Sequence, residues 1–200
     1  MTRVVCTARP SVMMDGMQLT SGMLLVATPA LQDPNFVDTV VLLLDVTPDG
    51  ALGVVLNRPT QVLVADVLEP WRDVVAEPEV LFRGGPVGTD GALAVAALRD
   101  PQDTPVGWRP VSGLIGMVDL DTPTELVDGS LAAMRVFAGY AGWGASQLEG
   151  EVEEGSWYVV SAQPDDAFRG DTSGLRRDVM RRQPGMLAWH ANRPVDPDLN

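Results

Sequence analysis

The chain has 200 residues, of which 46% are hydrophobic and 20% charged, an ordinary composition for a globular protein. This length can bury a large core without help from disulfides or metal ions. The net charge is −13, with 27 acidic residues against 14 basic ones, and every basic residue is an arginine. Such a surface repels nucleic acids and anionic membranes at long range, so neither is an expected partner.

Several features of the chain point to a cytoplasmic protein. Cys6 is the only cysteine, which excludes an intrachain disulfide and a thiol-based metal site within one chain. Apolar runs stay far below the ~18 residues of a membrane-spanning helix, and the N-terminus lacks the apolar centre of a secretory signal. We expect a single domain over residues 1–200, with a mobile extension at 1–19 and a globular core at 20–200.

Short apolar runs between turn residues predict a β-rich fold. Residues 22–28 and 37–46 are expected strands, and T-P-D-G at 47–50 predicts a hairpin into a third strand. Further strands are expected at 80–87, 91–98, 114–120, 131–140 and 157–162, and helices at 62–75 and 173–183. The connections are mostly too short for parallel crossovers. The fold class is therefore α+β, with a mixed, largely antiparallel sheet and flanking helices.

The stretch G-Y-A-G-W-G-A-S-Q-L-E-G-E at 139–151 combines glycines, aromatic rings and carboxylates. Ser146 and Glu149 have the spacing of a capping box, which predicts a helix from Gln147 that ends at Gly155. The glycines before it are then a bend, over which Tyr140 and Trp143 would pack. A phosphate-binding loop is the rival interpretation. The spacing matches no nucleotide-binding motif, and the glutamates that follow favour a solvated face.

Two arginine motifs are the better candidates for binding. L-N-R-P at 56–59 and F-R-G-G-P-V at 82–87 each place an arginine beside glycine or proline at the end of an expected strand. Guanidinium and backbone N–H groups could together bind one small anion, although turn formation alone also explains both motifs. The candidate ligand-binding residues are Asn57, Arg58, Arg83, Gly84 and Gly85.

Other candidates for chemistry are few. His190 is the only histidine and has no motif partner, so we expect no catalytic residue, no metal site and no cofactor. Four arginines lie on the expected helix at 173–183, where they either complement the helix dipole or form a nucleic-acid patch; we favour the first interpretation. These four are Arg176, Arg177, Arg181 and Arg182.

Taken in order, several of these segments resemble the AlgH/YqgE family of bacterial proteins. The matching segments are G-M-L-L-V-A-T-P-A-L-Q-D-P-N-F at 22–36, G-A-L-G-V-V-L-N-R-P at 50–59, R-G-G-P-V at 83–87, the stretch at 139–151 and D-P-D-L-N at the C-terminus. The chain departs from the family pattern at 38–39, where Asp-Thr replaces the usual Arg-Ser, and at 45–46, where Asp-Val replaces Glu-His. The second departure argues against an essential histidine in this chain.

The resemblance implies one α+β domain whose forked sheet curls into a pseudo-barrel, and it implies no reaction. The family name reflects a proposed role in transcriptional control of alginate synthesis, but the sequence shows no recognisable helix-turn-helix. We therefore expect a non-enzymatic cytoplasmic protein that binds a partner protein or a small anionic ligand, with a regulatory effect. A transcriptional regulator that contacts DNA is the alternative, followed by an unrecognised hydrolase.

Overall fold

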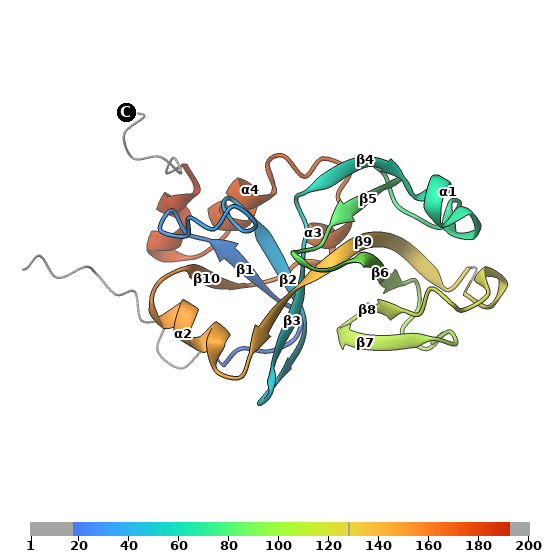
Figure 1. Cartoon of the computed structure of the whole chain (residues 1–200), viewed down its shortest axis with the longest axis horizontal. Helices are drawn as coiled ribbons and strands as arrows, with labels where there is room; N and C mark the ends of the chain where they lie inside the picture. The colour runs from blue at the N-terminus through green and yellow to red at the C-terminus, as the bar shows by residue number, and fades with distance from the viewer. Residues whose placement is uncertain (1–17, 128, 193–200) are drawn as a thin grey trace, which may run out of the picture.

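The computed structural model describes residues 18–127 and 129–192, which form a β-rich fold with short helices (Figure 1). The strands are β1 (Met23–Ala27), β2 (Val40–Thr47), β3 (Gly50–Val55), β4 (Pro59–Leu63), β5 (Val80–Arg83), β6 (Val87–Leu98), β7 (Trp108–Ser112), β8 (Ile115–Val118), β9 (Leu131–Gly144) and β10 (Trp157–Ser161). The helices are α1 (Val64–Val67), η1 (Glu69–Trp71), η2 (Thr124–Leu126), α2 (Gln147–Glu153), α3 (Pro164–Phe168), α4 (Leu175–Arg181) and η3 (Gly185–Asn192).

The sheet forks at β9, its longest strand. The main path runs β10-β1-β2-β3-β9-β6-β8-β7, and β5 joins β9 as a branch that also carries β4. The N-terminal part of β9 pairs with β6, whereas Ala141–Gly144 pair with β3. The β5–β9 pair is parallel, and all other strand pairs of the described residues are antiparallel. The predicted fold class, an α+β fold with a mixed, largely antiparallel forked sheet, is confirmed.

Glycines make the fork possible because backbones cross there at very short distances. Gly139, in the middle of β9, has a φ of +68°, and a Cβ at this position would lie 2.7 Å from the carbonyl oxygen of Val87. A Cβ on Gly84 would lie 2.1 Å from the carbonyl oxygen of Gly139. A side chain at either position would clash with backbone. These glycines therefore allow β9 to leave β6 and to continue alongside β3.

The sheet curls until its far edge meets its beginning. The end of β7 approaches the start of β1 so closely that a Cβ on Gly22 would lie 2.2 Å from the Cβ of Ser112. Arg109 on β7 donates a hydrogen bond of 2.5 Å to Asp45 on β2. Both contacts join strands at opposite ends of the sheet path, so the pseudo-barrel implied by the family resemblance is present.

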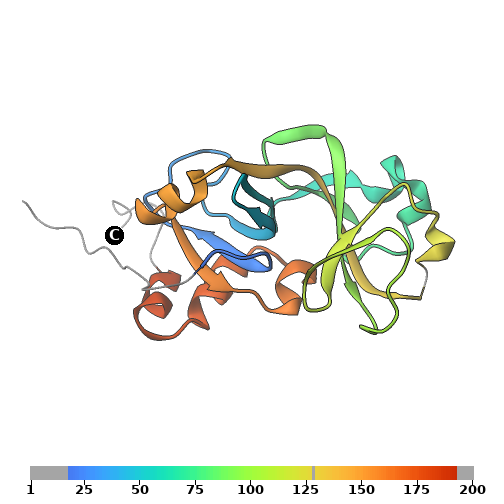
Figure 2. The same ribbon diagram turned by 90° about the horizontal axis from the view of Figure 1, so that it is seen from below.

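Hydrophobic side chains cover both faces of the β1–β2 part of the sheet. Leu24 and Val26 face a core shared with α3 and α4, whereas Leu25 and Ala27 face a second core that includes Leu148 of α2. Figure 2 shows α3 and α4 on one side of the sheet and α2 on the other. Burial on both faces explains why these strands read as unbroken apolar runs. A third core packs β6, β8 and the first half of β9 against η1.

The strands at 22–28, 37–46, 114–120 and 157–162 and the helix at 173–183 are confirmed, with small shifts of their ends. The helix at 62–75 is wrong. Its first residues form β4, which pairs with β5, and only the short α1 and η1 follow. Pro70 denies a longer helix one backbone donor. The expected extension at 1–19 lies mostly outside the described residues, but Leu19 already packs against the core.

Two short elements of the structure were not predicted from the sequence. Strand β7 and helix α3 had no counterpart among the expected elements. β7 contains Pro110 and an exposed arginine, a composition typical of edge strands, and it lies at the edge of the sheet.

None of the helices in the described part of the chain is long and apolar enough to cross a membrane.

Candidate functional site

The glycine-rich stretch at 139–144 is part of a strand, which corrects the expected bend before the helix. Trp143 is the register partner of Ala51 and Ala141 that of Gly53, so β9 runs straight through the stretch beside β3. Gly139 has a positive φ, whereas Gly142 and Gly144 do not. The single kink is thus at the sheet fork and not at the helix.

Helix α2 begins at Gln147 as predicted, but without a capping box. Ser146 adopts a left-handed conformation with φ of 59°, and its side chain makes no capping hydrogen bond. The side-chain oxygen of Gln147 accepts the backbone N–H of Gly144 at 3.0 Å instead. The helix is followed by Gly155 with φ of +82°, which confirms the predicted end. The Gly144 N–H therefore already has a protein acceptor.

Three aromatic rings and one carboxylate form a closed unit, which we call the aromatic corner: Phe36, Trp143, Glu151 and Trp157. The ring centroids lie 5.7 to 6.1 Å apart. Both indole N–H groups donate to the same oxygen of Glu151, at 3.0 Å from Trp143 and 2.8 Å from Trp157. Both tryptophans are buried. Glu151 is thus a structural acceptor, whereas Glu149 and Glu153 are exposed as expected.

Asn57 and Arg58, two of the predicted ligand-binding residues, hold the loop before β2. The Asn57 amide accepts the N–H of Val40 at 3.0 Å and donates to the carbonyl of Asp38 at 2.8 Å. The Arg58 guanidinium donates to the carbonyls of Pro34 and Val37, both at 3.1 Å. The Asn57 amide is therefore committed to the fold, while the half-buried Arg58 keeps further N–H donors.

Gly84 and Gly85 pack tightly against β9. The N–H of Gly84 donates to Ala138 at 2.9 Å, and its carbonyl accepts from Val55 at 2.8 Å. A Cβ on Gly85 would lie 2.2 Å from the backbone of Tyr140. Close backbone approach therefore explains both glycines, and the Gly84 N–H already has a protein acceptor, so ligand binding by Gly84 and Gly85 stays a prediction.

The structure places Arg58 and Arg83 directly beside each other. Pro59 and Phe82 are register partners in the β4–β5 ladder, and the Arg83 N–H donates to the Arg58 carbonyl at 2.8 Å. Side chains of opposed residues in an antiparallel pair lie on the same face. Arg83 is exposed, and its guanidinium makes no hydrogen bond or salt bridge within the described ranges. We call these two residues the arginine pair.

Electrostatics make the arginine pair unusual in an acidic chain. Burial and the neighbouring Arg83 guanidinium lower the pKa of Arg58, whereas the nearby Asp38 and Asp33 carboxylates oppose this shift. Asp38 is also bound elsewhere, because its carboxylate lies 3.3 Å from Arg176. Like charges on directly opposed strand residues destabilise a sheet. An incoming negative group would relieve the repulsion between these two neighbouring cations.

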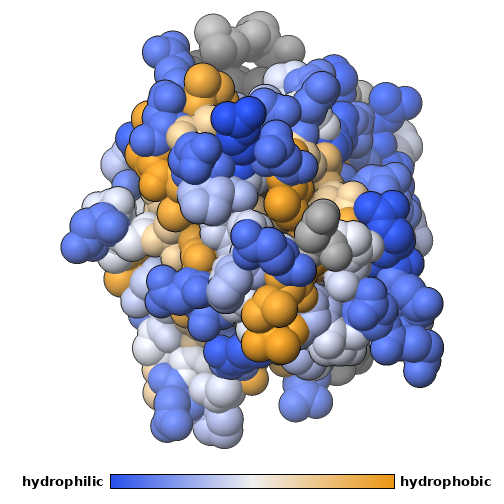
Figure 3. Space-filling model, turned by 90° about the vertical axis from the view of Figure 1, so that its right-hand side faces the viewer, coloured by the Kyte–Doolittle hydropathy of each residue, from blue (hydrophilic) through white to orange (hydrophobic). Residues whose placement is uncertain are grey.

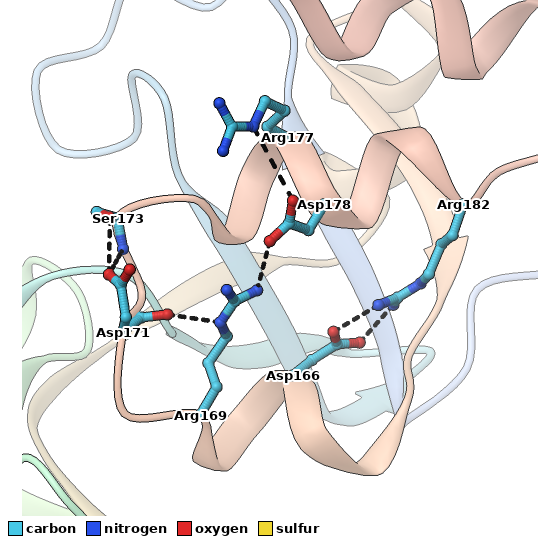
Figure 4. A network of polar contacts seen from close by, with 7 residues as sticks. All are labelled: Asp166, Arg169, Asp171, Ser173, Arg177, Asp178 and Arg182. Carbon is cyan, nitrogen blue, oxygen red and sulfur yellow. Dashed lines mark hydrogen bonds and ion pairs between the residues drawn. The ribbon is translucent and has the colours of Figure 1, made fainter.

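Two of the four arginines predicted on the helix at 173–183 are tied into the fold; α4 itself ends at Arg181 and Arg182 is its C-cap. Arg176 is buried and donates to the carbonyl of Ala27 at 3.1 Å. Arg182 binds both carboxylate oxygens of Asp166, with one contact of 2.6 Å, as Figure 4 shows. Arg177 and Arg181 are exposed, but Arg177 lies near Asp178. The helix therefore does not present a row of four free cations. The favoured interpretation, that the arginines complement the helix dipole, fits Arg181 in the last turn but not Arg176 and Arg177, which lie in the first turn.

Arg135 is a buried polar residue that the sequence analysis missed. It lies 4.2 Å above the Phe82 ring and donates to the carbonyls of Glu77, Ala167 and Arg169 at 2.8 to 2.9 Å. Burial lowers its pKa to about 10, so the guanidinium stays charged at neutral pH. The alternation in M-R-V-F could have placed Arg135 and Phe137 on one face. Arg135 fastens α3 to the fork and has no exposed group for a ligand.

Two hollows in the described part of the surface do not include the arginine pair. One of about 330 Å³ lies between residues 73–76 and the start of β9, and one of about 500 Å³ lies over β8 beside Arg109 and Asp119. Neither lining includes a serine, threonine, cysteine, lysine or histidine. No group of three or more His, Cys, Asp or Glu side chains in the described ranges could hold a metal ion. The side chain of His190 lies outside the described residues.

The fold is an α+β pseudo-barrel in which the sheet forks at β9. Comparisons with known proteins identify the family that has this fold. The profile described as AlgH-like (DUF179) matches residues 24–188. A UPF0301 protein of Streptomyces coelicolor is 55% identical over 183 residues, covering 90% of this chain and 95% of that protein. A UPF0301 protein of Thermobifida fusca is 51% identical over 196 residues, covering 94% and 98%. The chain belongs to the AlgH-like family.

Solved structures agree with this assignment. A crystal structure of a Corynebacterium diphtheriae protein is similar with a TM-score of 0.83 at 30% identity, covering 88% of this chain and 93% of that chain. The solution structure of the AlgH protein from Pseudomonas aeruginosa is similar with a TM-score of 0.63 at 26% identity, covering 82% and 91%. The family and fold are thus known, while the relatives carry no activity in their descriptions.

Proposed function

We propose that this chain is a non-enzymatic binding protein of the cytoplasm, and that a small anionic group of a ligand or partner binds to the arginine pair. The observation that carries the proposal is the cross-strand arrangement of Arg58 and Arg83. Two cations share one face of a two-stranded ladder in a chain of net charge −13. Because the pair costs stability in the free protein, an anion between the guanidinium groups gains both Coulomb energy and hydrogen bonds.

The two arginines have different tasks in this proposal. The Arg58 guanidinium is held by Pro34 and Val37, so it loses little conformational freedom on binding. Arg83 is exposed and supplies donors without breaking an intramolecular bond. A fixed donor beside an adaptable one suits a planar carboxylate or a phosphate group. Binding at this position would act on β4, β5 and the loop before β2, and this coupling is the basis for the regulatory effect.

Binding of inorganic phosphate tests the proposal directly. Isothermal titration should show phosphate binding to the wild type, and Arg83→Ala should weaken it by about tenfold or more because one cation is lost. Arg83→Lys should recover only part of the affinity, since lysine cannot donate in a bidentate fork. Arg181→Ala is the matched control, because Arg181 is also exposed but lies on α4.

Two outcomes would contradict the anion site. Equal phosphate affinity for the wild type and Arg83→Ala would place the binding elsewhere. Absence of binding by phosphate, sulfate and acetate alike would remove the proposal altogether. A fall in affinity for Arg181→Ala as large as that for Arg83→Ala would indicate that only the overall charge matters.

A further inference from the structure

A second unusual surface lies at the β4–α1 end of the molecule, away from α2 and α4 (Figure 1). We define the β4–α1 surface as residues 61–67. Three of its large apolar side chains are exposed: Val62 by 43%, Leu63 by 47% and Val67 by 54%. Figure 3 faces this end of the molecule and shows apolar side chains reaching the surface between hydrophilic ones. Adjacent exposed apolar residues of this size mark an interaction surface more often than isolated ones do.

Strand β4 also has an open backbone edge. Between residues 58 and 64, the backbone groups of the even-numbered residues form hydrogen bonds with β5 and the residue before it. The Arg58 carbonyl accepts from the Arg83 N–H, and the Val64 N–H donates to the Glu79 carbonyl at 3.0 Å. The Thr60 hydroxyl bridges the irregularity between them by donating to Leu81 at 2.7 Å and accepting from Val62 at 3.1 Å. By alternation, the backbone groups of Gln61 and Leu63 point away from β5, and of these the Leu63 C=O is the N-cap acceptor of α1.

Nothing in the described ranges pairs with that outer edge. β4 pairs with β5 alone, and its sequence P-T-Q-V-L has no charged residue. Natural proteins usually protect such edges with lysine, proline or a bulge. Here Pro59 protects the first position only, and the irregularity is bridged on the β5 side. The outer edge of β4 is therefore able to accept one more strand.

The charges around this surface restrict what the added strand can be. Asp66 lies within it, Glu69 and Asp73 follow it closely in the chain, and Glu79 lies opposite Val64; all four carboxylates are exposed. The basic residue among them is Arg72, which already lies 3.9 Å from Glu69 and 3.5 Å from Asp73. Apolar side chains within an acidic rim complement a segment that has apolar and basic residues. A second copy of this chain would bring the same carboxylates and would be repelled.

We propose that the outer edge of β4 binds an extended segment of a partner protein in which apolar and basic residues alternate. The N–H and C=O of Gln61 and the N–H of Leu63 pair with the segment, as in β-strand addition, whereas the Leu63 C=O belongs to α1 as its N-cap. Val62 and Leu63 lie on opposite faces of β4, so the apolar side chains of the segment, which share one face, contact only one of them, and its basic side chains lie on the other face near the carboxylates. This interaction is separate from anion binding at the arginine pair, because Arg58 and Arg83 lie at the start of β4, whereas the carboxylates follow its end and have the opposite charge.

The experiment uses a labelled peptide of about nine residues in which lysine and valine alternate, a length that matches one strand with overhangs. Fluorescence anisotropy should show binding to the full chain that weakens between about 50 mM and about 200 mM salt. A peptide of the same composition with proline at alternate positions cannot form a strand and should not bind. A glutamate–valine peptide should not bind either, since the rim repels it.

Variants of the chain separate this site from unspecific attraction to an acidic protein. Gln61→Pro removes one outward N–H and should reduce peptide affinity at least about tenfold. The double variant Asp66→Asn with Glu69→Gln should also weaken binding severalfold. Its matched control is Glu149→Gln with Glu153→Gln, which removes two exposed carboxylates from α2 at the other end of the molecule.

The outcomes decide the proposal in either direction. Weaker binding in the β4–α1 variants with unchanged binding in the α2 variant supports it. Equal losses in both double variants, or equal affinity for the proline-containing peptide, would show unspecific charge attraction and overturn it. No binding of the lysine–valine peptide by the wild type at the lower salt concentration would overturn it as well. Dimerisation of the wild type that Gln61→Pro abolishes would assign the edge to a second copy instead.

Discussion

The aromatic corner and the arginine pair differ in how their polar groups are satisfied. In the aromatic corner both indole N–H groups reach Glu151, and both tryptophans are buried. In the arginine pair, Arg83 has donors without a described partner and faces a second cation. A cluster whose groups satisfy one another adds stability, whereas a cluster with unmatched charge is ready for a ligand. The glycine-rich and aromatic stretch at 139–151, which is the more conspicuous motif in the sequence, thus has a structural role.

The largest expected effect is loss of stability when the aromatic corner loses a ring. Trp143→Ala removes a buried side chain that contacts Phe36 and Trp157, so it should lower the free energy of unfolding by about 3 kcal/mol or more. Chemical denaturation followed by circular dichroism measures this loss. An unchanged midpoint would mean that the corner is not a structural unit, and would return the stretch at 139–144 to the list of binding candidates.

A smaller loss is expected when the corner keeps its rings but loses its carboxylate. Glu151→Ala leaves two indole N–H groups without their acceptor and should cost about 2 kcal/mol. Glu151→Gln retains one side-chain oxygen and should cost less. The same denaturation experiment measures both variants, with Glu153→Ala as an exposed control on the same helix. A loss for Glu153→Ala as large as that for Glu151→Ala would argue for a general effect on α2.

The arginine pair should show the reverse behaviour. Arg83→Ala removes a like charge opposite Arg58 and no described side-chain bond, so the free energy of unfolding should change by less than about 0.5 kcal/mol or rise slightly. Phosphate affinity should fall in the same protein. Strong destabilisation by Arg83→Ala would make Arg83 a structural residue like those of the aromatic corner. The contrast between a stabilising cluster and a binding cluster would then no longer hold.

The smallest effect is expected for DNA. Because Arg176 and Arg182 are bound within the fold, only two arginines of α4 remain exposed. A labelled duplex should show no specific complex with the wild type, and its weak binding should disappear as salt is raised from about 50 to about 200 mM. A submicromolar complex that Arg177→Ala with Arg181→Ala weakens would instead favour the transcriptional regulator.

Prediction from sequence succeeded where burial was continuous along a segment. β1 and β2 are buried on both faces, so their apolar runs are visible without knowledge of their neighbours. It failed at residues 62–75, where the spacing of apolar residues suits a helix but β5 supplies a pairing partner for β4. It also failed at Ser146, whose left-handed backbone leaves its side chain without a capping hydrogen bond. Both failures depend on geometry that the neighbouring residues in the chain do not reveal.

The candidate site shows the same limit more sharply. The sequence identified Arg58 and Arg83 as notable but did not bring them together, since 25 positions of chain separate them. The same analysis also selected Asn57, Gly84 and Gly85. In the structure the Asn57 amide and the Gly84 N–H are already hydrogen-bonded within the protein, and Gly85 packs against the β9 backbone. A residue type and its neighbours in the chain cannot show whether a hydrogen bond is already formed.

The sequence by itself determined the β-rich α+β class, the hairpin at 47–50, the acidic surface and the family, because local periodicity, turn chemistry and ordered motifs carry that information. The tertiary structure alone decided that β9 runs through the glycines, that Glu151 joins two tryptophans, and that β4 has an open edge. The physical reason is that the partner of a buried polar group or of a strand edge usually comes from a segment distant along the chain. Whether such a group is free to bind a ligand or another protein depends on whether folding has supplied an internal partner.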